Sequence, residues 1–527
     1  MFRRGIRIKK NLSLPKQNHE VIELAPKELL SADLAQNLQK MMSTLGNSSD
    51  IIKKEITIGE DGLIRAGIIY TDGMADTTNI LDALMLKVRQ ANVSQDLACS
   101  TNLVKLLKDT VLDIGDVKEA DDFETIYSAV LSGDTLILLD GQAQGLIAST
   151  RNYKDRGVTE PTAQSVIRGP REGFSETLRT NTALMRRKIK DPNLWIETRK
   201  IGRVTKTDVS IMFIKGIVNE TVLQEVRQRL DRIDIDAILE SGYVEELIQD
   251  HTFTPFPTVF NTERPDAAAA GLLEGRVAIL VDGTPFILLV PALFSQFFQA
   301  SEDYYQRADF ATLVRLLRYI SFFIALLAPS LYIAITTFHQ EMLPTPLLIG
   351  VAAQLEGVPF PAFVEALMME LTFEILREAG VRMPRAIGQS VSIVGTLVIG
   401  QAAVEAGLVS AAMVIVVSIT AISNFVFPSF NMGISIRILR FVLMALAATF
   451  GLFGITIGLI VLVLHLCSLR SFGVPYMAPF APLIIDDQKD TIFRVPLWGM
   501  HKRPRSINKS NLIRERNEPV PPLPDQR

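Results

Sequence analysis

The sequence predicts an α/β soluble amino-terminal domain of two duplicated subdomains, followed by an all-α polytopic membrane domain. Two observations predict this fold class. Residues 319–467 contain no Asp and no Lys, although both residue types are frequent before and after this stretch. Because burying a charge in hydrocarbon costs about 3 kcal/mol or more, such a stretch indicates a lipid environment. Upstream of it, matching segments recur about 142 residues apart, which indicates an internal duplication.

The duplication rests on two pairs of segments in the same order. Residues 68–76 match residues 211–219, and each reads as a buried strand, a Gly turn and a capped helix start. Residues 131–141 match residues 273–283, and each reads as a helix end, a strand and an Asp-Gly turn. We therefore expect two related α/β subdomains.

The domain boundaries follow from this repeat and from the change in composition after residue 300. They are an N-terminal extension (1–49), a first cytoplasmic α/β subdomain (50–152), an Arg-rich connector (153–199), a second cytoplasmic α/β subdomain (200–300), a helical transmembrane domain of four to six spans (301–470), and a cytoplasmic tail (471–527) that is disordered after about 503.

Composition and motifs argue against several classes of function. The net charge of −3 is near neutral, so we expect no nucleic-acid partner. The sequence has no G-x-x-x-x-G-K-[ST] loop, G-x-S-x-G elbow, H-E-x-x-H pair or C-x-x-C pair, so we expect no enzyme, no cofactor and no metal site. Asp72 and Asp140 each precede Gly, and turn or cap roles explain both.

The connector is rich in arginine, including Arg156, Arg168 and Arg171. One interpretation is a site for an anion or a partner. The other is a solvated linker whose arginines pair with the acidic subdomains, since runs of charge are usually solvated.

The first predicted span, residues 319–338, follows Arg307, Arg315 and Arg318, which places the soluble part on the cytoplasmic side. A later helix carries Glu370, Glu374 and Arg377 on one face, so it is interfacial, faces water, or spans while packed against partners. Both termini are expected in the cytoplasm, with four or six crossings. Either the helix with these charges does not cross, or the apolar run at 441–467 folds back on itself.

A candidate pore stripe consists of Val391, Val394, Val398, Gln401 and Glu405 at helical spacing. In a ring of such helices the valines would form a constriction that gates by dewetting, and an acidic mouth would favour cations. The alternative is that the valines face lipid and Glu405 lies in a short loop.

Five motifs resemble one known family. They are residues 155–161 (DRGVTEP), 168–174 (RGPREGF), 357–361 (GVPFP), 385–390 (RAIGQS) and 475–480 (PYMAPF). Together they resemble the spore germination receptor A subunits, the GerA family, over roughly residues 45–500.

The resemblance implies a multi-pass protein of the spore inner membrane that acts with a transporter-like B subunit, which senses nutrients, and a lipoprotein C subunit. It also implies a non-enzymatic homo-oligomer that forms a germinant-gated ion channel and opens to initiate germination. It moves the interpretation of the arginine connector toward a structural or assembly role. The other functions considered are a secondary transporter with substrate near Glu370 and Glu374, and a non-conducting scaffold that couples a sensor to other machinery.

Overall fold

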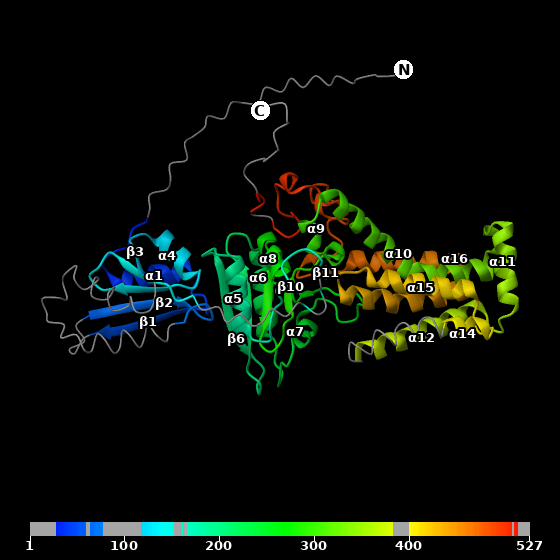
Figure 1. The fold of residues 1–527 in the computed structure, drawn as a ribbon, viewed down its shortest axis with the longest axis horizontal. Coiled ribbons are helices and arrows are strands. Elements are labelled where there is room, and N and C mark those ends of the chain that lie inside the picture. The colour runs from blue at the N-terminus through cyan, green and yellow to red at the C-terminus, as the bar shows by residue number, and fades with distance from the viewer. Residues whose placement is uncertain are drawn as a thin grey trace, which may run out of the picture.

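The computed structural model describes residues 28–58, 64–76, 117–151, 161, 164, 166–382, 400–508 and 511–514. Along the longest axis of the chain lie a first sheet with its helices, a second sheet with its helices, and a bundle of long helices (Figure 1). This order confirms the predicted fold class of two α/β units followed by helices.

The first sheet has five strands in the order β1-β2-β4-β5-β3, and all its ladders are antiparallel. Every residue of β4 and β5 is buried, as the apolar sequences TLILL and GLIA require. Helices α1 and α4 share one hydrophobic core with these strands. The elements are α1 (Leu34–Thr44), β1 (Ile51–Ile58), β2 (Ile64–Thr71), β3 (Val117–Ala120), α4 (Phe123–Val130), β4 (Thr135–Leu139) and β5 (Gly145–Ala148).

The second sheet repeats this topology, with the order β6-β7-β9-β10-β8 and antiparallel ladders throughout. Its strands carry one hydrophobic core on each face, and one of the two cores continues into the helical bundle. The elements are α5 (Leu178–Lys188), β6 (Leu194–Ile201), β7 (Thr207–Ile214), α6 (Glu220–Asp231), α7 (Ser241–Ile248), β8 (Phe260–Thr262), α8 (Pro265–Glu274), β9 (Val277–Val281) and β10 (Ile287–Val290).

Equivalent contacts at the start of each repeat confirm the duplication. Asp140, in the turn after β4, accepts a hydrogen bond from the backbone N–H of Leu34 at 3.3 Å. Asp282, in the turn after β9, accepts the corresponding bond from Leu178 at 2.9 Å. Both bonds satisfy an N–H group of the first helical turn, which has no partner within its own helix. Each repeat therefore includes the helix that precedes its first strand.

A buried ion pair joins the two repeats. The guanidinium of Arg186 in α5 contacts both carboxylate oxygens of Asp50 at 2.7 and 3.0 Å, and both side chains are fully buried. Next to it, the backbone N–H of Ser49 donates to the carbonyl of Ile196 at 3.0 Å. The contact at the start of β1 thus ties the first repeat to β6 of the second.

The helical bundle follows a short 3-10 helix at the end of the second sheet. Helix α10 packs along both α15 and α16. It has 31 residues, and an 18-residue window within it has a mean hydropathy of 1.9. Helix α16 has 39 residues, and its window reaches 2.4. Among the described residues, these two helices are long and apolar enough to cross a membrane. The elements are η3 (Phe294–Phe298), α9 (Glu302–Tyr305), α10 (Ala308–Phe338), η4 (Gln340–Met342), α11 (Thr345–Glu356), α12 (Ala362–Arg382), α14 (Gly400–Glu405), α15 (Ala411–Phe425) and α16 (Phe430–Ser468).

Helix α16 is a hairpin of two antiparallel arms. At Gly451 the backbone adopts φ 62° and ψ −141°, a region that is essentially restricted to glycine. Ser435 on the first arm donates to the carbonyl of Pro255 at 2.5 Å, and His465 on the second arm lies 2.9 Å from the hydroxyl of Thr254. In a straight helix, residues thirty positions apart would be about 45 Å apart. Of the two topologies left open by the sequence, the structure adopts the folded-back run.

These contacts define the two ends of the bundle. We call the end that touches the Thr254–Pro255 loop the proximal end, and the end at Gly451 the distal end. Helix α15 begins distally, where Tyr332 of α10 lies 3.3 Å from Ser410, and it ends proximally, where Phe427 stacks edge-on against Phe298.

The chain after α16 returns to the second sheet. Ser471 donates to the carbonyl of Thr258 at 2.7 Å, and Asn508 donates to the carbonyl of Ile217 at 2.5 Å. An isolated bridge pairs Lys502 with Ile513. Disorder after about 503 stays a prediction. The elements are β11 (Arg470–Ser471), β12 (Val474–Pro475), η6 (Asp486–Asp490) and η7 (Leu497–Gly499).

Candidate functional site

Helix α12 carries the predicted intramembrane charges, and the structure pairs them with arginines of α16. Glu370 lies 2.7 Å from Arg440 (Oε2 to Nη2), and Glu374 lies 2.5 Å from Arg437 (Oε2 to Nη1). A longer contact of 3.6 Å joins Glu374 to Arg440. Residues three or four positions apart are neighbours on a helix, so each helix presents one charged face to the other. With Arg377, these residues form what we call the α12–α16 charge cluster.

The cluster also reaches α15 and is largely buried. The side chains of Glu370 and Arg440 are 2% and 3% exposed. When the side-chain amide of Asn424 is oriented with its oxygen toward Arg377, that oxygen accepts from both Nη atoms at 2.9 and 3.1 Å. The same guanidinium lies over the ring of Phe425, 5.1 Å from its centroid. Of the three settings predicted for α12, the structure therefore favours a helix packed against partners.

The candidate pore stripe is only partly visible. Val391, Val394 and Val398 lie outside the described residues. Gln401 and Glu405 lie on α14, where the Gln401 amide donates to the Glu405 carboxylate at 2.9 Å and both side chains are exposed. Gly400 faces Val414, in the first turn of α15, so the polar pair lies at the distal end of the bundle.

One buried carboxylate at the distal end was not singled out in the sequence. Glu365 is fully buried and accepts a hydrogen bond from the backbone N–H of Ser410 at 2.9 Å. Ser410 is the N-cap of α15, so this carboxylate lies at the positive end of that helix. The signal in the sequence is an acidic residue five positions before Glu370 on the same helix.

The connector attaches to the second subdomain through its backbone. The N–H groups of Ile167 and Arg168 donate to the carboxylate of Glu302 at the start of α9. The carbonyl of Pro170 accepts from Arg264 at 3.0 Å. Arg171 belongs to the described residues, and Arg156 lies outside them. In these contacts the connector contributes its main chain at residues 167, 168 and 170.

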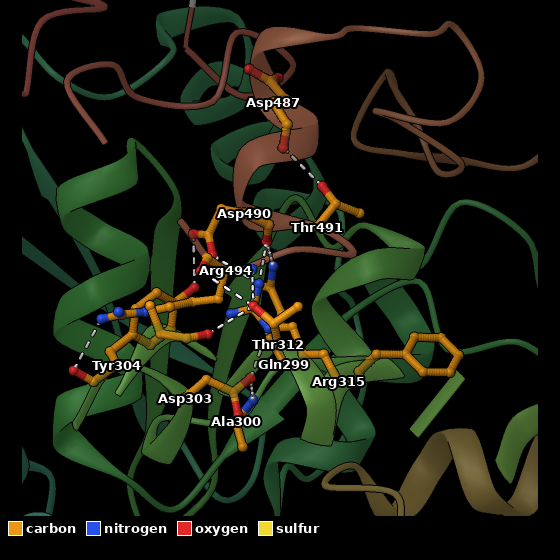
Figure 2. Close-up of polar contacts among 12 residues, drawn as sticks. Gln299, Ala300, Asp303, Tyr304, Thr312, Arg315, Asp487, Asp490, Thr491 and Arg494 are labelled. Carbon is orange, nitrogen blue, oxygen red and sulfur yellow. Dashed lines mark hydrogen bonds and ion pairs between the residues drawn. The ribbon is translucent and has the colours of Figure 1, made fainter. Parts of the chain in front are cut away.

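A second polar site holds the C-terminal segment against the base of α10 (Figure 2). Asp490 contacts Arg315 at 2.9 Å through its side chain and accepts from the Tyr304 hydroxyl at 2.8 Å. Its backbone carbonyl accepts from Gln299 at 2.5 Å and from Arg315 at 2.7 Å. We call this network, with Asp303 and Arg318, the Asp490 clasp.

Asp303 is the buried counter-ion of the clasp. It lies 2.9 Å from Arg315 and 2.8 Å from Arg318, and the side chains of Asp303 and Arg315 are 2% and 0% exposed. Figure 2 shows Asp303, Arg315 and Asp490 converging between η6 and α10. Burial raises the pKa of Tyr304 well above its ordinary range, so this phenol stays a hydrogen-bond donor. The clasp thus fixes the point where the soluble part joins α10.

A cavity of about 230 Å³ adjoins the clasp between α8, α9 and the C-terminal segment. Its lining includes Glu274, Arg276, Tyr305 and Arg514. Burial raises the pKa of Glu274 and lowers the pKa of Arg276, and their side chains lie 3.4 Å apart. Within the described ranges, no group of three His, Cys, Asp or Glu side chains is arranged to hold a metal.

Comparison with known proteins decides the family. Residues 39–506 match the family described as Bacillus/Clostridium GerA spore germination protein. The chain belongs to the GerA family. It is 52% identical over 493 residues to spore germination protein KA of Bacillus subtilis, an alignment that covers 94% of this chain and 90% of that protein. It is also 45% identical to the B. subtilis membrane protein YfkQ, over 92% of this chain and 93% of that protein.

One solved structure is similar to part of this GerA-family chain. The N-terminal domain of the A subunit of the Bacillus megaterium spore germinant receptor GerK3 is 44% identical, with a TM-score of 0.42. The match covers 51% of this chain and 98% of that domain.

Proposed function

We propose that this GerA-family chain is the A subunit of a nutrient germinant receptor and that it oligomerises to form an ion-conducting channel. Opening of the channel in response to germinants initiates germination. The observation that carries the germination role is the family match along residues 39–506, together with relatives that are named spore germination proteins. The channel is the finer part of the proposal.

Two features support the channel. The Gln401–Glu405 pair at the distal end is exposed, so it is open to water or to another copy of the chain. On α12, Leu371 and Ile375 are 49% and 69% exposed, which leaves an apolar face for lipid or for a neighbouring copy. An acidic ring built from Glu405 would favour cations.

The chain is a multi-pass protein of the spore inner membrane in this proposal, and its soluble part faces the spore core. Arg307 and the buried Arg315 and Arg318 precede the first apolar run, in agreement with a cytoplasmic proximal end. The partners are a transporter-like B subunit that senses the nutrient, a lipoprotein C subunit and membrane lipid. The chain carries out no enzymatic reaction and needs no cofactor.

Reconstitution in liposomes with ion-flux recording tests the channel. Replacing Val394 or Val398 with Ser should increase resting flux and cause premature germination of spores that carry the variant. Val463→Ser is the matched control, because Val463 is also an apolar residue of the helical domain, is 51% exposed and belongs to the second arm of α16 rather than to the pore stripe. Flux in both pore variants equal to that of the control would refute the pore assignment.

Two other outcomes identify the remaining functions. Uptake of a nutrient against its gradient, without independent ion flux, would indicate a secondary transporter. Absence of any transport, with germination still dependent on the chain, would indicate a scaffold. The pairing of Glu370 and Glu374 with arginines of the same chain favours the channel over a transporter whose substrate binds these carboxylates.

A further inference from the structure

The α12–α16 charge cluster contains one more positive group than negative groups. Three arginines face two carboxylates, all within one set of contacts between 2.5 and 4.0 Å. The sequence between the end of α12 and the start of α14 adds Arg385 and contains no Asp or Glu. Glu378, which follows Arg377 in the sequence, pairs with Arg382 at 2.6 Å. Glu365 is engaged with Ser410 at the distal end. Among the described residues, the cluster therefore lacks one counter-charge.

Unused hydrogen-bond donors mark where this counter-charge belongs. The Nε atoms of Arg377, Arg437 and Arg440 are buried and have no acceptor among the described residues. The Oε1 atoms of Glu370 and Glu374 are also buried without a donor. Water molecules can bridge these oxygens to the guanidinium groups, but a neutral water leaves the excess positive charge uncompensated. An anionic group satisfies both the donors and the charge.

The cluster is open on one side. Arg377 and Arg437 are 14% and 17% exposed, whereas Arg440 is 3% exposed and forms the closed end. The open side lies beside Asn424 and Phe425, where α15 ends at the proximal face of the bundle. A headgroup of the proximal leaflet, or a small anion from the same aqueous side, can therefore reach Arg377 and Arg437.

We propose that the α12–α16 charge cluster binds one phosphate-type anionic group through Arg377 and Arg437. The planar fork of a guanidinium matches the geometry of phosphate oxygens, and two arginines side by side suit one such group. Its source is either the phosphate of an anionic lipid or free phosphate, because both present the same chemistry. This proposal rests on the membrane placement proposed above, and it does not require the chain to form a channel.

The test is the thermal stability of the full-length protein in detergent. Dioleoylphosphatidylglycerol and inorganic phosphate are titrated separately, with dioleoylphosphatidylcholine and sodium gluconate at equal ionic strength as references. A saturated site should raise Tm by about 5 °C, since ligand bound only to the folded state stabilises it. A rise with the lipid alone assigns a headgroup, and a rise with phosphate alone assigns a free anion.

Two variants remove the need for the anion in different ways. Arg437→Met deletes the excess charge, and Asn424→Asp places a carboxylate beside Arg377, where the amide oxygen now lies. Each should lose the anion-dependent rise, measured against its own Tm without anion. Arg382→Met is the matched control, because Arg382 lies on the same helix, is 78% exposed and pairs with Glu378. It should keep the full rise.

Two results would overturn the site. One is a wild-type protein whose Tm responds to neither anion, and the other is a rise of equal size in Asn424→Asp. A protein that stays soluble without detergent would instead refute the membrane placement. Absent ion flux with an intact anion response would refute only the channel.

Discussion

Asp303→Asn tests whether the buried clasp stabilises the junction between the soluble part and α10. The Asp303 carboxylate makes three contacts of 2.8–2.9 Å with Arg315 and Arg318, both buried. The substitution leaves Arg315 with the carboxylate of Asp490 and Arg318 with the carbonyl of Phe298. Removing one partner of a buried ion pair costs about 3–5 kcal/mol, because a charge is left without compensation. We expect a loss of that size, or a fall in Tm of roughly 10 °C.

The measurement uses the fluorescence of Trp498, which lies in η7 beyond the clasp. In a Trp195→Phe background this is the only tryptophan, because the sequence contains two. The matched control is Asp309→Asn, which breaks the exposed pair with Arg307 at the start of α10, and it should leave Tm unchanged. An Asp303→Asn protein that unfolds at the wild-type temperature, or no earlier than the control, would show that the clasp does not stabilise the junction.

Three further predictions concern other parts of the chain. Arg186→Met should destabilise the contact between the repeats by about 3–5 kcal/mol in chemical denaturation, and adding Asp50→Leu should recover much of the loss, since the unpaired charge is then gone. Gly451→Ala should lower Tm, because its Cβ would meet Phe338 and His339 in a conformation that alanine avoids, whereas Gly380→Ala in an open position of α12 should not. Burial raises the pKa of Glu245 from its ordinary 4.5 to about 7, so the folded state holds a proton that the unfolded state has lost. Stability from this residue is full below pH 4.5 and falls as the pH rises through 7; in Glu245→Gln, thermal unfolding from pH 5 to 8 should lose this component of the pH dependence.

The repeat was predictable from the sequence because its signal is local. Each copy has the same order of strand, Gly turn and Asp-Gly hairpin, and the antiparallel pairing follows from short connections. The helices that begin each copy were missed, since the copies share few residues there. One signal for these helices is an asparagine in each copy that bonds to the loop before the helix. Asn37 exchanges two hydrogen bonds with the backbone of Ser31, and Asn181 does the same with Ser175.

The clasp could not be predicted from sequence periodicity. Asp490 and Arg315 are 175 positions apart, and the intervening chain enters and leaves the bundle before they meet. The tail around Asp490 is rich in polar residues and in proline, a composition also typical of disordered segments. Its order comes from tertiary contacts with α9 and α10, which local composition does not encode.

The partners of the intramembrane charges are visible in the sequence, but their position suggests another role. Arg437 and Arg440 precede the apolar run at 441–467, and basic residues typically flank the cytoplasmic ends of spans. In the structure they are ion-pair partners of Glu370 and Glu374 inside the bundle. Arg437 and Arg440 are three positions apart, and Glu370 and Glu374 are four positions apart, so each pair lies on one face of its helix. Two helices with these faces turned toward each other are therefore one interpretation of the pattern. The fold-back at Gly451 stayed open because hydropathy continues unbroken through the turn.

The first arm of α16 concentrates two kinds of contact in a short stretch. Ser435 holds the Thr254–Pro255 loop of the second repeat, and Arg437 and Arg440 hold α12. These residues span less than two helical turns, about 8 Å along the axis. A displacement of that loop therefore acts on the same turns that position α12. The second repeat meets the bundle at both arms of α16, whereas the first repeat is tied through Asp50 to the second. In the contacts of the described residues, movement of the first repeat thus reaches this stretch, and α12, through the second repeat.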